Sequence, residues 1–250
     1  MNKAKLLSIG LITMALTACG GESKLEAKDQ DVANAKVEKV VEKVVEKAET
    51  SSSTKVLLGV DYKKLDNPVD IEGIENNSLL EVFWLGCPHC QSFEPAVREW
   101  KKANPDVNFV KMHAITQNPR WMIDSTIYNS LIMVGGKDEH VNALFDLYIK
   151  KMNEYQAAPS DSKPKPYPAI ADIFDFVEEQ GLDIEKFKES MSSEAMKDLN
   201  AKNAKIFNDA KLAGVPAFIV NGQYMITGKD VKSYEEYFEK VNAVLEKTNK

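Results

Sequence analysis

The sequence of 250 residues predicts an α/β fold in which a helical insertion interrupts a mixed core. An apolar run at residues 79–85 reads as a buried strand, and a helix and a second strand follow it. The central part of the chain then shows only helical patterns. Strand signals return at residues 217–227, just before a closing helix. This order of elements is typical of an α/β core with a helical subdomain inserted in it.

The first elements of the core begin near Val56. Residues 79–85 have the length and composition of a strand that is buried on both faces. A helix is expected over 88–103, because Pro88 suits the first position of a helix. Residues 107–113 alternate well enough to predict a second strand.

The insertion is expected at about residues 117–210. Helical patterns occupy residues 119–134, 138–154, 169–180 and 183–213. Prolines mark a loop between the second and third of these helices. They are Pro159, Pro164, Pro166 and Pro168.

The last elements are predicted to be a hairpin and a helix. Strands are expected at residues 217–220 and 223–227, joined by Asn221-Gly222, a favoured two-residue hairpin turn. An amphipathic helix then closes the chain. Its apolar positions include Val231, Tyr234, Phe238, Val241 and Leu245.

The N-terminus has the pattern of an export signal. Lys3 and Lys5 precede an apolar run at residues 6–16, which is too short to span a bilayer as a helix. The segment Leu16-Thr17-Ala18-Cys19-Gly20 resembles the lipobox of bacterial lipoproteins, in which the signal is cut before the cysteine and the thiol is acylated. The resemblance implies a signal peptide at 1–18 and a lipid anchor on Cys19. The alternative is an ordinary secretory signal with a chance cysteine.

Residues 19–55 are expected to form a lipidated tether. By resemblance to Gram-negative lipoproteins, Gly20 after the cysteine favours the outer membrane over the inner one. A valine repeat at residues 37–45 predicts either a charged spacer or a short coiled coil. The formal charge of −6, without a basic stripe, argues against nucleic acid as a partner.

Two of the three cysteines lie in Cys87-Pro88-His89-Cys90, at the predicted start of a helix. The unpaired N–H groups and the dipole of a helix N-terminus stabilise a thiolate, so Cys87 is the expected nucleophile. Cys90, one turn later, is the expected resolving thiol. His89 can add a donor or positive charge to the thiolate, and that stabilisation makes the disulfide more oxidising.

A metal site or a structural disulfide accounts less well for the two cysteines. Half a zinc site would need further ligands, but there is no second Cys-x-x-Cys and His113 and His140 are isolated. A structural disulfide across two residues would add little stability. We therefore expect redox chemistry, with no metal and no bound cofactor.

Pro216 marks a second site, since it lies where a strand should begin. A proline cannot donate to the sheet, and a cis peptide bond is a usual reason for such a placement. A trans proline at a strand start is the alternative.

Together these segments resemble the DsbA family of thiol:disulfide interchange proteins over residues 56–250. The segments that carry the resemblance are Leu80-Glu81-Val82-Phe83, Cys87-Pro88-His89-Cys90, Phe93-Glu94, Lys111-Met112-His113, Gly214-Val215-Pro216-Ala217 and Val220-Asn221-Gly222-Gln223-Tyr224. The resemblance implies a thioredoxin fold with an inserted helical domain. It also implies that Pro216 is a cis proline facing the disulfide and that Val215 offers its backbone to substrates.

Glu81 and Lys111 are further candidates for the site. A carboxylate within an apolar strand is costly unless it is paired, and Lys111 on the neighbouring predicted strand could pair it. In the family the matching residues lie beneath the active site, which suggests that Glu81 tunes or relays the proton of Cys90. The alternative is a surface charge. Leu85-Gly86 stands where many relatives carry an aromatic residue before the first cysteine, so the adjoining groove is expected to differ.

The expected function is a protein disulfide oxidase on the periplasmic side of a bacterial membrane. Its substrates would be reduced exported proteins, and by resemblance a DsbB-type membrane partner would reoxidise it. A thioredoxin-like reductase or isomerase is the alternative within enzymes. A lipoprotein adaptor that binds cysteine-containing segments without catalysis is the alternative outside them.

Overall fold

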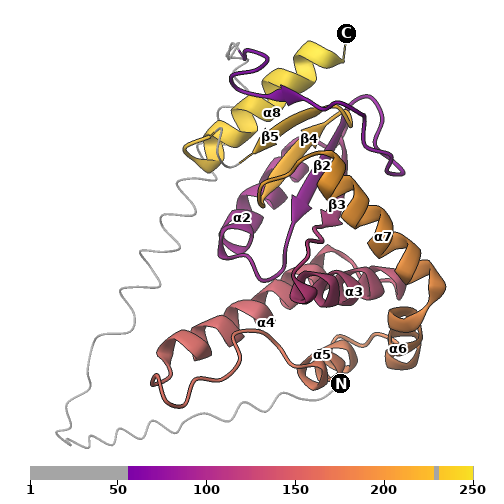
Figure 1. The fold of residues 1–250 in the computed structure, drawn as a ribbon, viewed down its shortest axis with the longest axis vertical. Helices are drawn as coiled ribbons and strands as arrows, with labels where there is room; N and C mark the ends of the chain where they lie inside the picture. The colour runs from indigo at the N-terminus through magenta and orange to yellow at the C-terminus, as the bar shows by residue number, and fades with distance from the viewer. Residues whose placement is uncertain (1–55, 228–230, 250) are drawn as a thin grey trace, which may run out of the picture. The chain divides into compact units, whose positions relative to one another are not determined.

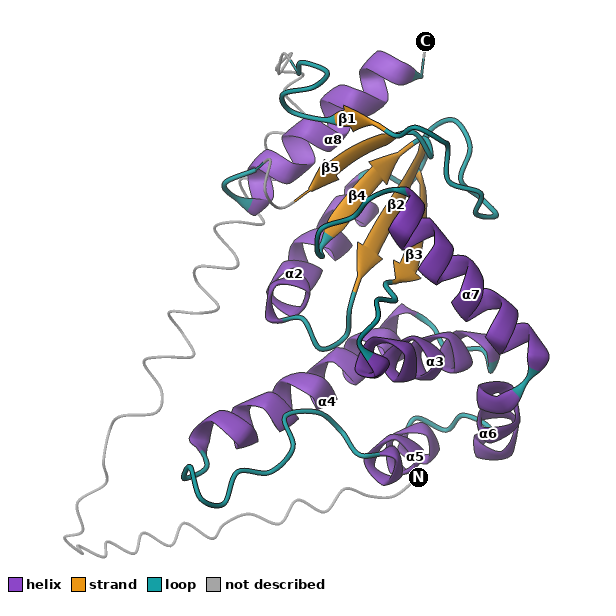
Figure 2. Ribbon diagram, in the orientation of Figure 1, coloured by secondary structure: helices purple, strands orange, loops and turns teal. Residues whose placement is uncertain are grey.

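A computed structural model describes residues 56–227 and 231–249 (Figures 1 and 2). The predicted signal peptide, Cys19 and the tether to residue 55 lie outside the described residues. One five-stranded sheet has the strand order β1-β5-β4-β2-β3. The strands are β1 (Lys63–Lys64), β2 (Ser78–Phe83), β3 (Asn108–His113), β4 (Ala217–Val220) and β5 (Tyr224–Thr227).

Strand β2 lies inside the sheet and sets its register. It runs parallel to β3, with Glu81 opposite Lys111, and antiparallel to β4, with Glu81 opposite Phe218. All six of its residues are buried. The predicted strand at 79–85 is thus present, but it ends at Phe83, and the next residues form a loop to the first long helix.

Helices cover both faces of the sheet. Helices α2 (Pro88–Ala103) and α8 (Tyr234–Thr248) pack against the face that carries Leu79 and Phe218. The end of α7 (Glu194–Asp209) packs against the opposite face, which carries Leu80 and Ile219. Leu79 and Leu80 contact different helices because successive strand residues point to opposite faces of a sheet.

Five helices lie between β3 and β4, where the helical patterns predict four. They are α3 (Pro119–Met133), α4 (Asp138–Ala157), α5 (Ile170–Glu179), α6 (Ile184–Ser192) and α7. The prediction of one helix over 183–213 is wrong, because α6 and α7 are separate. Ser193 lies between them in an extended conformation, and its hydroxyl accepts a hydrogen bond from the Met196 N–H at 3.1 Å. A serine side chain that caps a new helix in this way ends the preceding one.

The hairpin turn differs slightly from its prediction. Asn221 and Gly222 have φ angles of 50° and 66°, as the favoured hairpin turn requires. Val220 pairs with Tyr224, however, so three residues rather than two separate the paired positions. Strand β1 was not predicted, because two exposed lysines carry no strand pattern; it pairs with the edge of β5.

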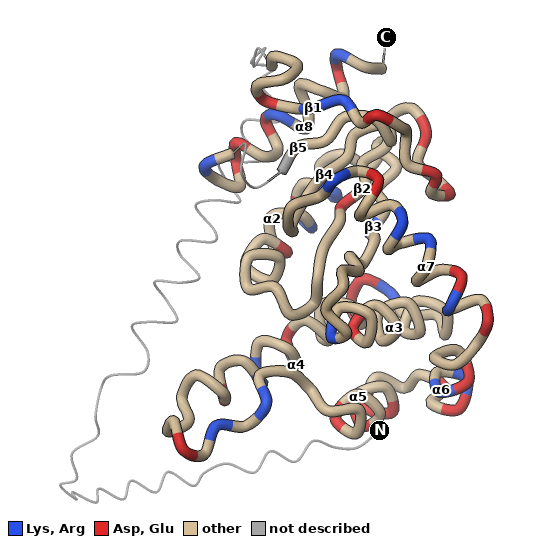
Figure 3. Tube along the Cα trace, viewed as in Figure 1, with Lys and Arg blue, Asp and Glu red and all other residues tan. Residues whose placement is uncertain are grey.

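Charged residues of both signs follow one another along α6 and α7 (Figure 3). Lys188 pairs with Glu185 and Lys197 with Glu194, each three residues apart on the helix surface. These faces are therefore solvated, in agreement with an amphipathic pattern. In the described part of the chain, no helix has both the length and the apolar character needed to cross a membrane.

Candidate active site

Cys87 is the N-cap residue of α2, and Pro88 occupies the first turn of that helix. The Cys87 N–H donates to the Trp84 carbonyl at 3.0 Å, which closes a turn between β2 and α2. Pro88 and His89 are exposed, whereas Cys90, one turn into the helix, is fully buried. Both cysteines are free thiols in this structure. Both cysteines are buried, and Cys90 is the more buried of the two, as expected for the second thiol: Cys87 is 7% exposed and Cys90 0%.

The two thiols have opposite electrostatic environments. The Cys90 thiol donates to Cys87, and the backbone N–H groups of Cys90 and His89 add to this, as does the charge of His89. Together they outweigh burial and lower the pKa of Cys87 from the ordinary 9.0 to about 6. Burial and the neighbouring Cys87 raise the pKa of Cys90 well above its usual range. One proton therefore stays on Cys90 while Cys87 is a thiolate at neutral pH.

Val215 and Pro216 lie beside Cys87, although they are more than a hundred residues away in the sequence. The peptide bond between them is cis, as predicted. The Cys87 thiol donates to the Val215 carbonyl, with 3.7 Å between sulfur and oxygen. The Pro216 carbonyl accepts from the Tyr237 hydroxyl at 3.2 Å, which ties this segment to α8.

A groove of about 430 Å³ opens next to this segment. It is mostly apolar, with His89 and Lys232 as its basic residues. Its lining comprises His89, Ala213, Gly214, Val215, Pro216, Val231, Lys232, Ser233, Tyr234 and Tyr237. Leu85 is not among these residues; it is fully buried against the core of the helical insertion. The expectation that the groove differs from that of relatives, because Leu85-Gly86 replaces an aromatic residue, stays a prediction.

Glu81 and Lys111 form a buried ion pair, with 3.0 Å between the carboxylate and the ammonium. The alternative of a surface charge is thereby excluded, since Glu81 has no exposed surface. Burial raises the pKa of Glu81 to about 7, against the opposing charge of Lys111. Burial would lower the pKa of Lys111, but the carboxylates of Glu81 and Glu94 raise it above its usual range. The negative charge of Glu81 in turn contributes to the raised pKa of Cys90.

Glu94 also belongs to this cluster; it lies in a segment that carries the family resemblance, but it was not predicted to be part of the site. It lies on α2, is buried, and accepts from Lys111 at 2.6 Å. The sequence does contain a sign of this role: Glu94 follows Phe93 on the apolar face of the helix, where a carboxylate needs a partner. One lysine thus serves two buried carboxylates.

His113 is isolated in the sequence, but in the structure it supports the loop before Cys87. Its Nε2 accepts from the Leu85 N–H at 3.3 Å, and its Nδ1 lies 2.9 Å from the Ala114 carbonyl. Burial lowers the pKa of His113 to about 3, so the ring is neutral. A neutral ring that donates through Nδ1 and accepts through Nε2 fits both contacts.

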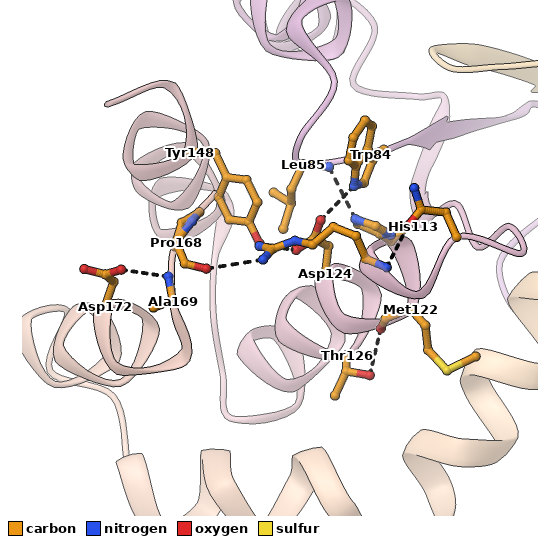
Figure 4. A network of polar contacts seen from close by, with 12 residues as sticks. Trp84, Leu85, His113, Met122, Asp124, Thr126, Tyr148, Pro168, Ala169 and Asp172 are labelled. Carbon is orange, nitrogen blue, oxygen red and sulfur yellow. Dashed lines mark hydrogen bonds and ion pairs between the residues drawn. The ribbon is translucent and has the colours of Figure 1, made fainter. Parts of the chain in front are cut away.

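A second polar network, also unforeseen, joins the insertion to the loop before Cys87 (Figure 4). Asp124 of α3 has no exposed surface. It accepts from the Trp84 indole at 2.7 Å and the Tyr148 hydroxyl at 2.5 Å, and it pairs with Arg120 at 2.7 Å. The sequence does contain a signal, since Arg120 and Asp124 are four residues apart on one predicted helix. The contact of Asp124 with Trp84 could not be predicted from the sequence, since the two residues are 40 positions apart.

Comparison with known proteins agrees with this geometry. Residues 124–238 match the family model described as DSBA-like thioredoxin domain. The thiol:disulfide interchange protein DsbA of Pseudomonas aeruginosa is 30% identical over 190 residues, which cover 76% of this chain and 84% of that protein. DsbL of Escherichia coli is 29% identical over 187 residues, with coverage of 71% and 81%.

Solved structures give the same result. A crystal structure of Pseudomonas aeruginosa DsbA superposes with a TM-score of 0.65 at 28% identity, covering 77% of this chain and 94% of the other. The oxidoreductase NmDsbA1 from Neisseria meningitidis, at 19% identity, shares the fold with a TM-score of 0.60 and covers 78% and 94% of the two chains. The fold is therefore a thioredoxin fold with an inserted helical domain, as predicted. With its Cys-Pro-His-Cys at a helix start facing Val215-Pro216, the chain belongs to the DsbA family of thiol:disulfide oxidoreductases.

Proposed function

We propose that this protein oxidises pairs of thiols in exported proteins by donating the Cys87–Cys90 disulfide. The observation that carries the proposal is the asymmetry of the two sulfurs. Cys87 is the thiol with the lowered pKa, and it borders the apolar groove through Val215. Cys90 is buried behind it. A substrate can therefore reach only the sulfur that is the better leaving group.

The exchange takes two steps. A substrate thiolate attacks the Cys87 sulfur, the Cys87–Cys90 bond breaks, and Cys90 leaves with the electron pair and takes up a proton. A second substrate thiolate then attacks the substrate sulfur of the mixed disulfide, and Cys87 leaves as a thiolate. The substrate loses two electrons and the enzyme gains them, so no cofactor is needed. Stabilisation of the Cys87 thiolate favours the reduced enzyme and makes its disulfide an oxidant.

Neighbouring residues have supporting roles in this proposal. His89 and the start of α2, set by Pro88, stabilise the Cys87 thiolate. Val215 and Pro216 offer backbone to the substrate polypeptide beside the groove. Glu81 supplies the proton that Cys90 takes up when it leaves, since a buried carboxyl whose pKa is about 7 can hold a proton at neutral pH. Lys111 holds Glu81 in place through their ion pair.

The equilibrium of the purified protein with reduced and oxidised glutathione tests the direction of the reaction. We expect an equilibrium on the oxidising side of glutathione. A potential near that of thioredoxin, about −270 mV, would instead assign the chain to the reductases. A Cys90→Ala variant should accumulate mixed disulfides with exported proteins through Cys87, whereas a Cys87→Ser variant should accumulate none. If Cys87→Ser restored disulfide formation in cells as well as the wild type does, the non-catalytic adaptor would be correct.

The proposed location is the periplasmic face of a bacterial membrane, with Cys19 as the lipid-bearing residue and the outer membrane favoured. The support is the lipobox-like segment and Gly20 after it. The proposed reoxidant is a DsbB-type membrane protein, and its support is the resemblance to the DsbA family. Incorporation of labelled palmitate into the wild type but not into Cys19→Ser would support the anchor. Equal release of both proteins from the membrane fraction would contradict it.

A further inference from the structure

The loop that delivers Cys87 to the start of α2 lies directly against the indole ring of Trp84. A Cβ atom placed on Gly86 would lie 2.5 Å from Cζ2 of that ring, so the backbone and the ring are in close contact. The Trp84 carbonyl also accepts from the Cys87 N–H at 3.0 Å. The backbone at Gly86 therefore packs directly against the indole ring, one residue before Cys87.

The indole ring is held by groups that come from the helical insertion. Its N–H donates to the buried carboxylate of Asp124 at 2.7 Å, and its ring stacks on Trp121 with 4.6 Å between centroids. Tyr167, from the loop before α5, packs against the same ring at 5.7 Å. The insertion thus surrounds a side chain of the thioredoxin core.

Asp124 is in turn fixed by Arg120. The guanidinium pairs with Asp124 at 2.7 Å and donates to the Pro168 carbonyl at 3.3 Å. It also lies over the Tyr167 ring, 4.8 Å from the centroid. Figure 4 shows how Trp84, Asp124, Tyr148 and Pro168 converge on this point. Arg120 therefore links Asp124, which holds the Trp84 indole, to the loop that carries Pro168 and Tyr167.

The Arg120–Asp124 pair is only partly shielded from water, because the Arg120 side chain is 23% exposed, and such a pair is a modest source of stability. The desolvation of the two charges offsets most of their attraction, and apolar replacements of similar volume are often neutral or stabilising. The pair does constrain the carboxylate, because Oδ1 of Asp124 is engaged by Tyr148 and Arg120 and Oδ2 accepts from the Trp84 indole. The main role of the Arg120–Asp124 pair is therefore to hold Trp84 in position, rather than to stabilise the insertion.

We infer that the Arg120–Asp124 pair is a positioning device for Cys87, acting through the Trp84 indole that Asp124 holds. With the indole in place, Gly86 and Cys87 follow a path that brings the Cys87 sulfur to the N–H groups of His89 and Cys90. When the indole loses its acceptor, the loop relaxes and the sulfur loses part of that contact. The inference rests on the proposed function only for its consequence, a weaker oxidant, and not for its geometry.

The test is a double-mutant cycle on the full chain. Asp124→Asn leaves a weaker, uncharged acceptor, Trp84→Phe removes the indole N–H, and the third variant carries both changes. Tyr148→Phe is the matched control, because it removes another donor from Asp124 but leaves the Trp84 contact. The measurement is the pH midpoint at which Cys87 becomes a thiolate, from its ultraviolet absorbance and from its alkylation rate in the reduced protein.

We expect the midpoint to rise by about one pH unit, a tenfold loss of thiolate stabilisation, in each of the two single variants. The double variant should show no further rise, since both changes break the same contact. Tyr148→Phe should keep the wild-type midpoint even if its thermal stability falls. The inference would be overturned if Asp124→Asn and Trp84→Phe both fold and keep the wild-type pH midpoint of Cys87. It would also be overturned if the midpoint shifts of the two single variants add in the double variant.

The same proteins separate this inference from the proposed function. At pH 7 a one-unit rise from pKa 6 should move the glutathione equilibrium about fivefold towards the oxidised enzyme. If the wild type lies on the reducing side of glutathione, the oxidase proposal fails, while the midpoint shifts still decide the role of Asp124. If Asp124→Asn does not fold, Trp84→Phe alone still provides the midpoint that decides between the two outcomes.

Discussion

Replacing Cys87 with serine should change how the stability of the reduced protein depends on pH. The pKa of Cys87 is lowered to about 6 in the folded state, chiefly by the hydrogen bond from Cys90, and is close to 9.0 in the unfolded chain. A group whose pKa is lowered by folding stabilises the fold above its unfolded pKa and loses that effect as the pH falls through its folded pKa. A serine hydroxyl does not titrate in this range, so the variant lacks this contribution.

The size of the effect follows from the two pKa values. At pH 5 both states of the chain are protonated at Cys87, and the contribution is close to zero. It reaches about 1 kcal/mol at pH 7 and about 3 kcal/mol at pH 8. The gap in unfolding free energy between wild type and Cys87→Ser should widen by these amounts relative to pH 5.

The assay is urea unfolding of both proteins in a phosphine reductant, at intervals between pH 5 and pH 8. The range stops at pH 8 because Cys90 begins to titrate in the unfolded chain above it. Cys90→Ser serves as the control, since its hydroxyl can still donate to Cys87 and the pH slope should remain. A gap between wild type and Cys87→Ser that stays constant from pH 5 to pH 8 would refute the assignment of Cys87 as the thiolate.

Two further predictions concern the surroundings of Cys87. Gly86→Ala should destabilise the protein by about 1–3 kcal/mol in urea unfolding, because the new Cβ would lie 2.5 Å from Trp84 and 2.9 Å from Tyr167; an unchanged midpoint would show that the indole does not constrain the loop. In the oxidised protein, stability should fall by up to about 3 kcal/mol as the pH rises from 4.5 to 7, because burial raises the pKa of Glu81 to about 7, and Glu81→Gln should abolish this fall. The same slope in both proteins would assign it to another group.

Much of the fold could be predicted because its signals are local. An apolar run, interrupted only by Glu81, marks the buried strand β2, and the proline at the first turn marks α2. The turn at Asn221-Gly222 follows from residues that tolerate positive φ angles. Each of these signals is contained in a few consecutive residues. The separate α6 and α7 were missed because the one relevant signal, the cap at Ser193, competes with a helical pattern on both sides.

The placement of the two cysteines could also be predicted from the sequence, since their spacing and the helix start put Cys87 at the N-cap and Cys90 one turn further in. The partnership of Glu81 with Lys111 could be predicted because neighbouring strands place residues opposite one another. Glu94 could not be predicted as the second partner, since its contact depends on how α2 packs on the sheet.

Only the tertiary structure decided what surrounds the motif. Asp124 reaches Trp84, and Val215 reaches Cys87 as only the family resemblance had implied, across segments whose separation along the chain carries no information about their separation in space. Periodicity, capping residues and turn residues specify local conformation through steric limits and backbone hydrogen bonds. Contacts between distant segments depend instead on how the elements pack, and that packing is a property of the whole chain.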